Sequence, residues 1–176
     1  MKYGLEEQLL HASLLCGLKP GKEAAHRLQL IFVCNFDLHS TNHQSDFQRA
    51  LESGVDRNGM WENWPDKGSG KYRITNKGYE RATSLLGDVQ PKYSPASKSR
   101  CNYTLEGHIG NVRVLIRTIA GEGEIYLDGK LCDSAKEGCR QLERMSGIKL
   151  KTAGDSAVRV LYNLAIDNGF QMKWGV

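Results

Sequence analysis

The 176-residue sequence lacks a long hydrophobic run. Its longest apolar stretch, residues 28–34, is interrupted by Gln29 and is far shorter than the roughly 18 residues that indicate a membrane-spanning helix. The N-terminus lacks the basic and then apolar pattern of an export signal, since Glu6 and Glu7 lie where the positive flank belongs. We therefore expect a soluble cytoplasmic protein that has no membrane partner.

Strong charge of one sign is also missing. The chain has 24 lysines and arginines against 20 acidic residues, a formal net charge of +4. This balance disfavours an acidic solvating protein, and it is too mild to establish a nucleic-acid partner on its own. Any binding of a polyanion must therefore depend on local basic patches.

Closely spaced cysteines are absent as well. The five cysteines are odd in number and include no CxxC pair, which favours reduced thiols packed as small apolar groups. Cys34, His39 and His43 lack a second nearby cysteine and so do not complete a zinc site. No glycine-rich phosphate loop is present, and we expect neither a metal nor a cofactor.

Proline and serine are concentrated in residues 88–100, a composition typical of an extended linker. This segment holds three basic residues and one acidic residue, whereas residues 1–87 hold 11 and 10, and residues 101–176 hold 10 and 9. We predict a first domain over 1–87, a basic linker over 88–100 and a second domain over 101–176.

The first domain is predicted to contain three helices, a hairpin and a closing helix. Helical spacing covers 4–16, 23–33, 41–53 and 76–86, and short strands at 59–64 and 71–75 flank a glycine-rich turn. This order resembles a winged helix-turn-helix. The resemblance is closest at Tyr72–Arg81, which is similar to the family's "Y-x-L-T-x-x-G" step, with Thr75 capping the last helix and Gly78 allowing that helix to approach the sheet.

The second domain is predicted to have the order β-β-α-α-β, which makes the whole chain α+β. Strands are expected at 112–119, 124–128 and 170–174, and helices at 135–145 and 156–166. The hairpin at 123–130, the helix led by Ser134 and the terminal segment 168–174 resemble the restriction-enzyme and adenine-methyltransferase associated (RAMA) domain. In this family the domain is proposed to recognise modified DNA.

Together the two resemblances imply a protein of restriction-modification or gene regulation that binds double-stranded DNA, with or without base modification, as a monomer or homodimer. In a bacterium such a protein would associate with the nucleoid. A winged helix places its third helix in the major groove and its wing on the backbone. The expected DNA-binding residues are Asn42, His43, Gln44, Gln48, Arg49, Lys67, Lys71, Arg73, Lys77, Lys92, Lys98, Arg100, Arg113 and Arg117.

Each of these assignments has an alternative. The polar residues of 41–53 also suit a solvated helix face, since Asp46 and Glu52 would repel phosphates. Tyr126, Phe170 and Trp174 suit either a pocket that stacks a base or a packed core.

Two other functions remain open. Glu106, Asp128 and Lys130 would serve a Mg²⁺-dependent nuclease, in which acidic groups bind the metal and the lysine stabilises charge. A protein-interaction module without DNA binding is the second. We favour a DNA-binding protein without catalysis of its own.

Overall fold

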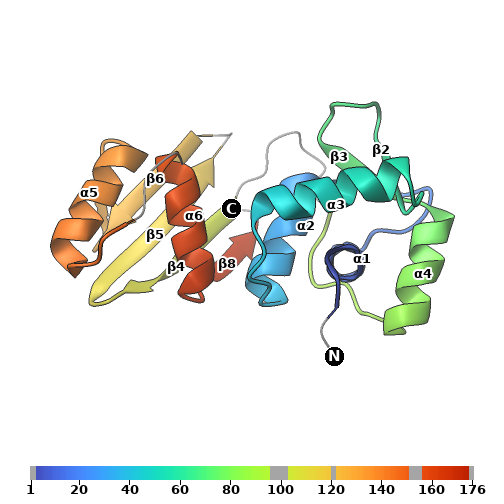
Figure 1. Cartoon of the computed structure of the whole chain (residues 1–176), viewed down its shortest axis with the longest axis horizontal. Helices are drawn as coiled ribbons and strands as arrows, with labels where there is room; N and C mark the ends of the chain where they lie inside the picture. The colour runs from blue at the N-terminus through green and yellow to red at the C-terminus, as the bar shows by residue number, and fades with distance from the viewer. Residues whose placement is uncertain (1–2, 96–102, 120–121, 151–155, 175–176) are drawn as a thin grey trace. The chain divides into compact units, whose positions relative to one another are not determined.

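The computed structural model describes residues 3–95, 103–119, 122–150 and 156–174. The chain divides into two compact units, 1–99 and 100–176. Both contain helices and antiparallel sheet, which confirms the α+β class (Figure 1). None of the helices in the described ranges is long and apolar enough to cross a membrane.

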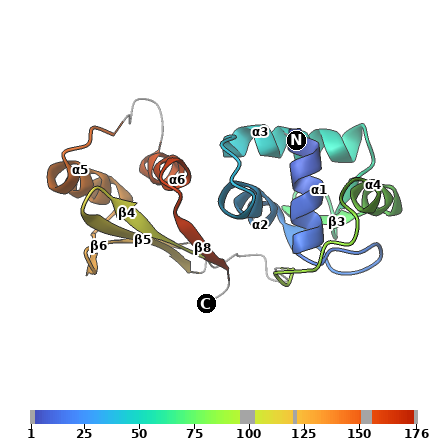
Figure 2. The same ribbon diagram turned by 90° about the horizontal axis from the view of Figure 1, so that it is seen from below.

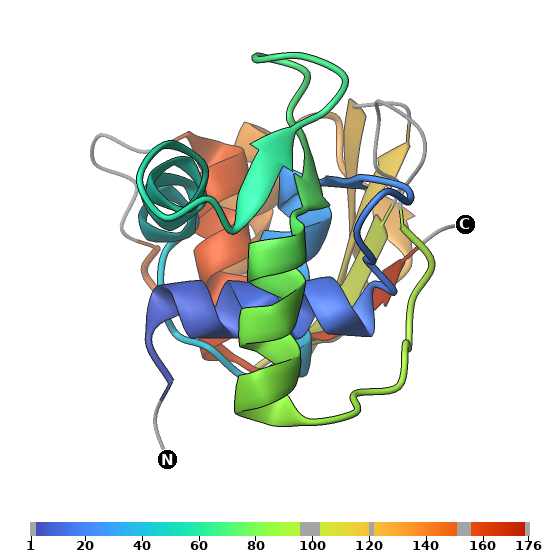
Figure 3. The ribbon, with the colours of Figure 1, turned by 90° about the vertical axis from the view of Figure 1, so that its right-hand side faces the viewer.

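The first unit packs four α-helices and a π-helical turn around a small antiparallel sheet of order β1-β3-β2. Helix α1 packs against α2, α3 and α4, and Figure 3 shows α4 crossing α1. The elements are α1 (Leu5–Leu15), β1 (Ala25–His26), α2 (Arg27–Phe32), η1 (Val33–Asp37), α3 (Gln44–Asp56), β2 (Trp61–Asn63), β3 (Lys71–Ile74) and α4 (Asn76–Leu86).

The core of this unit surrounds Trp61. Its ring is 1% exposed, and its indole N–H donates to Ser13 Oγ at 3.0 Å. The Ser13 hydroxyl in turn donates to the Leu9 carbonyl at 2.8 Å, so this buried polar pair leaves no donor unpaired. Phe47 and Leu51 are also fully buried.

Two predicted helix boundaries in this unit are wrong. The helix expected over 23–33 begins only at Arg27, because Ala25 and His26 pair with β3 as a short strand, and the helical path then continues through η1. The helix expected over 41–53 spans 44–56. Its start is delayed because the Asn35 amide donates to the carbonyls of Ser40 and Asn42, which holds the chain before it out of helical geometry.

The step from β3 into α4 forms as predicted. Thr75 is the N-cap, and its Oγ accepts from the Gly78 N–H at 3.0 Å. A Cβ built at Gly78 would lie 2.1 Å from the Met60 carbonyl oxygen, so only glycine allows α4 to lie this close to β2. Both roles assigned to these residues from the sequence are confirmed.

Residues 88–95, the described part of the predicted linker, lie against the first unit. The backbone N–H groups of Lys92 and Tyr93 both donate to the Leu15 carbonyl, and the Gln29 amide donates to the Ser94 carbonyl. These bonds occupy the last turn of α1 and the start of α2. The segment is thus part of the first unit's surface rather than a free spacer up to residue 95.

The second unit is a five-stranded antiparallel sheet of order β7-β6-β5-β4-β8. The predicted order β-β-α-α-β is wrong, because β4 and β7 precede and follow the predicted hairpin and β6 begins at Glu122. The elements are β4 (Tyr103–Ile109), β5 (Val112–Ile119), β6 (Glu122–Leu127), β7 (Lys130–Leu131), α5 (Ala135–Ser146), α6 (Ala157–Asp167) and β8 (Gln171–Trp174).

Helices α5 and α6 cover the same face of this sheet (Figure 2). Val114, Ile116 and Ile125 are buried there with Leu142 and Leu161 of the helices. Because strand side chains alternate, every second residue of β4, β5 and β6 lies on the opposite face, where no described element of the second unit covers it.

Four cysteines lie in the described parts of the chain, and all four have free, buried thiols, as predicted. Burial raises the pKa of Cys16 to about 12, so this thiol is protonated at neutral pH.

Candidate nucleic-acid interface

Helix α3 presents one side to the core of the first unit and the other to solvent. Phe47, Leu51 and Gly54 form the buried stripe, at the spacing of one helix face. A Cβ at Gly54 would lie 2.5 Å from the Trp61 ring, so the helix and this ring are in close contact. The outer side is polar and accessible, the property expected of a helix that reads a groove.

The outer side of α3 is acidic. Asp46, Glu52 and Asp56 carry three negative charges against the single positive charge of Arg49. The Arg49 guanidinium lies 3.0 Å from the Asp46 carboxylate, and the Gln48 amide lies 3.5 Å from Glu52. Asp56 was missed from the sequence because the helix was predicted to end at residue 53. The helix itself therefore offers no net attraction for phosphate.

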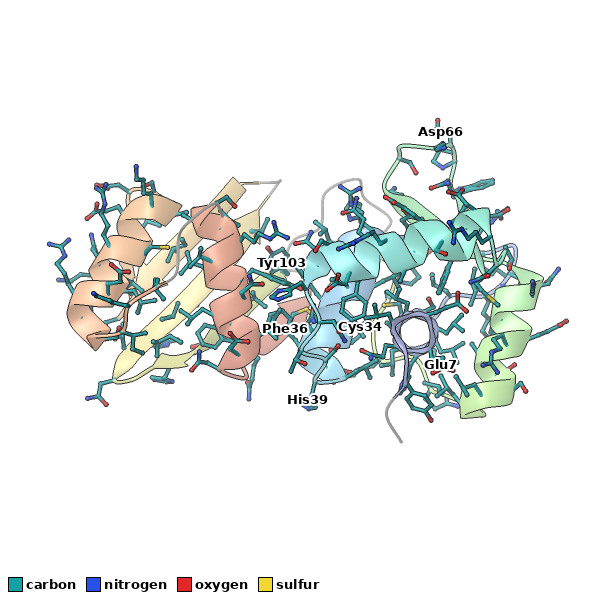
Figure 4. The ribbon with its side chains drawn as sticks, in the orientation of Figure 1. Glu7, Cys34, Phe36, His39, Asp66 and Tyr103 are labelled. Atoms are coloured by element: carbon teal, nitrogen blue, oxygen red, sulfur yellow. The ribbon has the colours of Figure 1, made fainter. Side chains whose placement is uncertain are left out.

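The β2–β3 loop, residues 64–70, projects from the first unit beside α3 (Figure 1). Asp66 lies in this loop (Figure 4), and Lys67 follows as an exposed side chain. Trp64 is 42% exposed, with the Arg73 guanidinium 3.8 Å from its ring centroid. The same guanidinium lies 2.6 Å from the Glu62 carboxylate, so Arg73 is engaged within the hairpin.

A cavity of about 310 Å³ lies between α3 and this loop. Its charged side chains are balanced, two basic and two acidic. The Arg27 Nε is shielded from solvent and has no hydrogen-bond partner among the described residues. The lining residues are Arg27, Glu52, Val55, Asp56, Asn63, Lys67, Gly68, Gly70 and Tyr72.

His26, directly before Arg27, is held neutral. Burial, and then the positive charges of Arg27 and Lys71, lower the pKa of His26 to about 4. Its Nδ1 accepts the Leu28 N–H at 3.2 Å and so caps α2. This histidine contributes no positive charge to the surface at neutral pH.

The predicted α3 residues are divided by the structure. Asn42 lies in the connection before the helix, where its amide donates to Ser40 Oγ at 2.9 Å. His43 is the N-cap and Gln44 the first helical residue. Only Gln48 and Arg49 lie within the body of the helix.

The other predicted lysines differ in their surroundings. Lys71 is half-buried in β3, whereas Lys77 is exposed in the first turn of α4. Lys92 forms an ion pair with Asp37, which also accepts from the Tyr93 hydroxyl at 3.0 Å. The hydrogen bond that the Lys92 ammonium donates to Asp37 raises the pKa of Lys92. Lys98 and Arg100 lie outside the described residues.

On the second unit, Arg113 and Arg117 lie on the sheet face opposite the helices. They border a depression of about 380 Å³ with Tyr126, which pairs with Leu115 across the strands. The Arg117 Nε is shielded and without a hydrogen-bond partner in the described ranges. The depression is lined by Thr104, Arg113, Leu115, Arg117, Tyr126 and Gly129.

The three predicted pocket aromatics do not form one pocket. Phe170 is 3% exposed, and a Cβ at Gly107 would lie 2.3 Å from its ring, so Phe170 belongs to the core. Tyr126 lies on the open face and donates to Glu124 at 2.8 Å. This hydrogen bond raises the pKa of Tyr126. Trp174 ends β8 opposite Tyr103, and its side chain lies outside the described atoms.

Glu106 and Asp128, the acidic residues of the nuclease alternative, both accept hydrogen bonds from Arg113. Its guanidinium donates to Glu106 at 2.8 Å through Nε, and its backbone N–H donates to Asp128 at 2.9 Å. Asp128 also has a left-handed φ of 48° and begins the tight turn to Lys130. Among the described residues, no three His, Cys, Asp or Glu side chains are grouped to hold a metal ion.

Comparison of the chain with known protein families, with curated proteins and with solved structures finds no match.

Proposed function

We propose that the first unit is a winged helix that binds double-stranded DNA, with α3 in the major groove and the β2–β3 loop on the backbone. The observation that carries the proposal is the order of elements: three helices, a sheet of order β1-β3-β2, and a projecting hairpin loop beside the third helix. An α-helix fits the major groove, where base edges are distinguishable.

The β2–β3 loop and the outer side of α3 differ in charge, so they suit different contacts with DNA. Lys67 and Arg27, beside the loop, are the groups suited to phosphate, because the outer side of α3 bears net negative charge. Gln48 is the residue of α3 suited to reading adenine, since its amide both donates and accepts. We therefore expect modest affinity with a shallow salt dependence.

The second unit supplies a second contact in this proposal. Arg117 and the half-buried Tyr126 line the same depression, and the shielded Arg117 Nε has no hydrogen-bond partner among the described residues. A cation and an aromatic ring in one depression suit a phosphate and an unstacked base. Sensing of a modified base would be carried out on this open face. Phe170, in the core, has no part in it.

Fluorescence anisotropy of a labelled duplex over a salt series tests the proposal. Lys67→Ala should weaken binding and reduce the slope of log K against log salt by about 1, because one phosphate contact is lost. Lys136→Ala, an exposed lysine of α5 in the second unit, is the matched control and should leave the slope unchanged.

Asp56→Asn tests where the duplex docks. Removing this negative charge from the outer side of α3 should strengthen binding, whereas Asp133→Asn in the second unit should not. If no duplex binds the wild-type protein at about 50 mM salt, where phosphate contacts are strongest, the proposal is wrong. The balanced charges beside α3 would then favour a protein-interaction module.

A further inference from the structure

A separate cavity of about 370 Å³ lies in the first unit, where the N-terminal half of α1 faces the connection from η1 to α3. Its volume lies within the range of small-molecule sites. Asn42, one of the predicted DNA-binding residues, lines this cavity, and α3 begins at Gln44 directly after the connection. The lining residues are Tyr3, Gln8, His11, Leu38, His39, Ser40, Thr41 and Asn42.

The lining residues that the structure describes include no lysine, arginine or carboxylate. Burial lowers the pKa of His11 against the opposing influence of Asp37, which favours its neutral imidazole at neutral pH. The remaining polar groups are the His39 imidazole, hydroxyls and carboxamides, all of which can donate or accept. Such a lining suits an uncharged ligand with several hydrogen-bonding edges.

One group in the lining has an unmet hydrogen bond. The Gln8 amide nitrogen donates to the Tyr3 carbonyl at 2.9 Å, but its oxygen is shielded from solvent without a partner in the described parts of the chain. A shielded acceptor without a donor is destabilising. A ligand N–H in the cavity would satisfy it once the Gln8 side chain turns to expose this oxygen.

The connection on the other side of the cavity is held in shape. Asn35 is 4% exposed and donates to the Ser40 and Asn42 carbonyls at 3.2 and 2.9 Å. His39, labelled in Figure 4, belongs to this connection. Its backbone has a left-handed φ of 55°, an uncommon conformation for a residue other than glycine. The wall is thus formed without a ligand, and it leads into His43, the N-cap of α3.

We propose that this cavity binds a small, uncharged, planar heterocycle of the nucleobase or nucleoside class. The Tyr3 ring and Leu38 supply flat apolar surface, and the Gln8 and Asn42 amides can pair with the edge of a base. Because the ligand would contact residues 38–42, it would stiffen the start of α3. That consequence for DNA affinity rests on the proposed function, whereas ligand binding does not.

Isothermal titration of the full-length protein without DNA tests the site, with adenosine, guanosine, cytidine and thymidine as probes and glucose as a non-planar comparison. We expect at least one nucleoside to bind, and Gln8→Met to weaken it at least about tenfold while the thermal unfolding midpoint stays unchanged or rises. Gln171→Met, on the exposed strand β8, is the matched control and should bind as wild type.

Thr41→Val provides a second variant, since this exposed threonine lines the cavity and its substitution replaces the side-chain hydroxyl with a methyl group. Unchanged nucleoside affinity in both Gln8→Met and Thr41→Val overturns the proposal, as does binding of glucose in place of every nucleoside. Absence of any heat or NMR shift of the His11 ring with all four nucleosides overturns it too. Failure of DNA binding alone would overturn only the proposed function.

Discussion

Replacing Gly78 by alanine should destabilise the first unit, against the usual preference for alanine in a helix. Gly78 lies in the first turn of α4, and its added Cβ would meet the Met60 carbonyl oxygen at 2.1 Å and the Ile74 Cγ1 at 3.0 Å. The oxygen belongs to backbone, which cannot rotate away as a flexible side chain can. The start of α4 must therefore move away from β2.

The size of the effect follows from two opposing contributions. Alanine in place of glycine favours a helix by about 1 kcal/mol. Overpacking of a close contact costs about 1–3 kcal/mol, and the short distance to Met60 places this site at the upper end of the range. Movement of α4 also strains the bonds that Thr75 makes to the Gly59 and Met60 carbonyls. We expect a net loss of about 2 kcal/mol.

Urea unfolding is followed by two NMR signals: the Trp61 indole N–H reports on the first unit, and the methyl groups of buried Leu142 report on the second. Gly138→Ala is the matched control, because Gly138 also lies near the start of a helix, α5, and its Cβ would meet only the Ile125 side chain at 3.2 Å. This variant should change the free energy of unfolding by less than about 1 kcal/mol. Equal or greater stability of Gly78→Ala relative to wild type would refute the close packing of α4 on β2.

Two further predictions concern stability. Ser13→Ala should cost about 1–3 kcal/mol, because it leaves the buried Trp61 N–H without an acceptor; a loss below about 0.5 kcal/mol in the same urea experiment would contradict this. His26 has a pKa of about 4 in the folded protein against 6.5 for the free side chain, so unfolding takes up a proton between these values. The stability that depends on neutral His26 is fully present above about pH 6.5 and is lost as the pH falls to about 4. In His26→Gln, the thermal unfolding midpoint should therefore vary less with pH between these two values. An unchanged pH dependence of the midpoint would argue against a neutral buried histidine.

Short sequence motifs predicted the helix caps and the hairpin turn of the fold. The Thr75 cap depends on the Gly78 N–H three residues later. The need for glycine at position 78 comes instead from Met60, but the sequence motif that contains Gly78 is itself local. Ser134 likewise caps α5 by accepting the Glu137 N–H. Such caps and turns are readable from sequence because the residues that decide them are neighbours.

Elements that depend on distant partners were missed. The two-residue strand β1 exists only because β3, some 45 residues later, pairs with it at Ala25↔Tyr72. Strand β4 contains Gly107, a poor strand residue, which is required because the Phe170 ring occupies the space of its side chain. The same contact explains why Phe170 could not be assigned to core or pocket from sequence: nothing local identifies its neighbour.

The net charge of the candidate interface also could not be predicted from the sequence alone. The sequence places Arg49, Asp46 and Glu52 on one helix, but only the extension of α3 to residue 56 adds Asp56 beside Glu52 in the cavity facing Lys67. Two carboxylates about 6 Å from a phosphate in water would oppose binding by about 0.7 kcal/mol each, roughly tenfold together. A single lysine contact gains a comparable binding free energy by releasing a counterion.

The sign of the net interaction of this surface with a duplex therefore depends on which side chains come closer to the phosphates. Lys67 and Arg27 favour binding, and Glu52 and Asp56 oppose it. A flexible loop lysine can extend toward the backbone, whereas a carboxylate on the helix body cannot retreat from it. That asymmetry favours attachment through the loop, with α3 tolerated in the groove only where its amide and hydroxyl groups meet base edges.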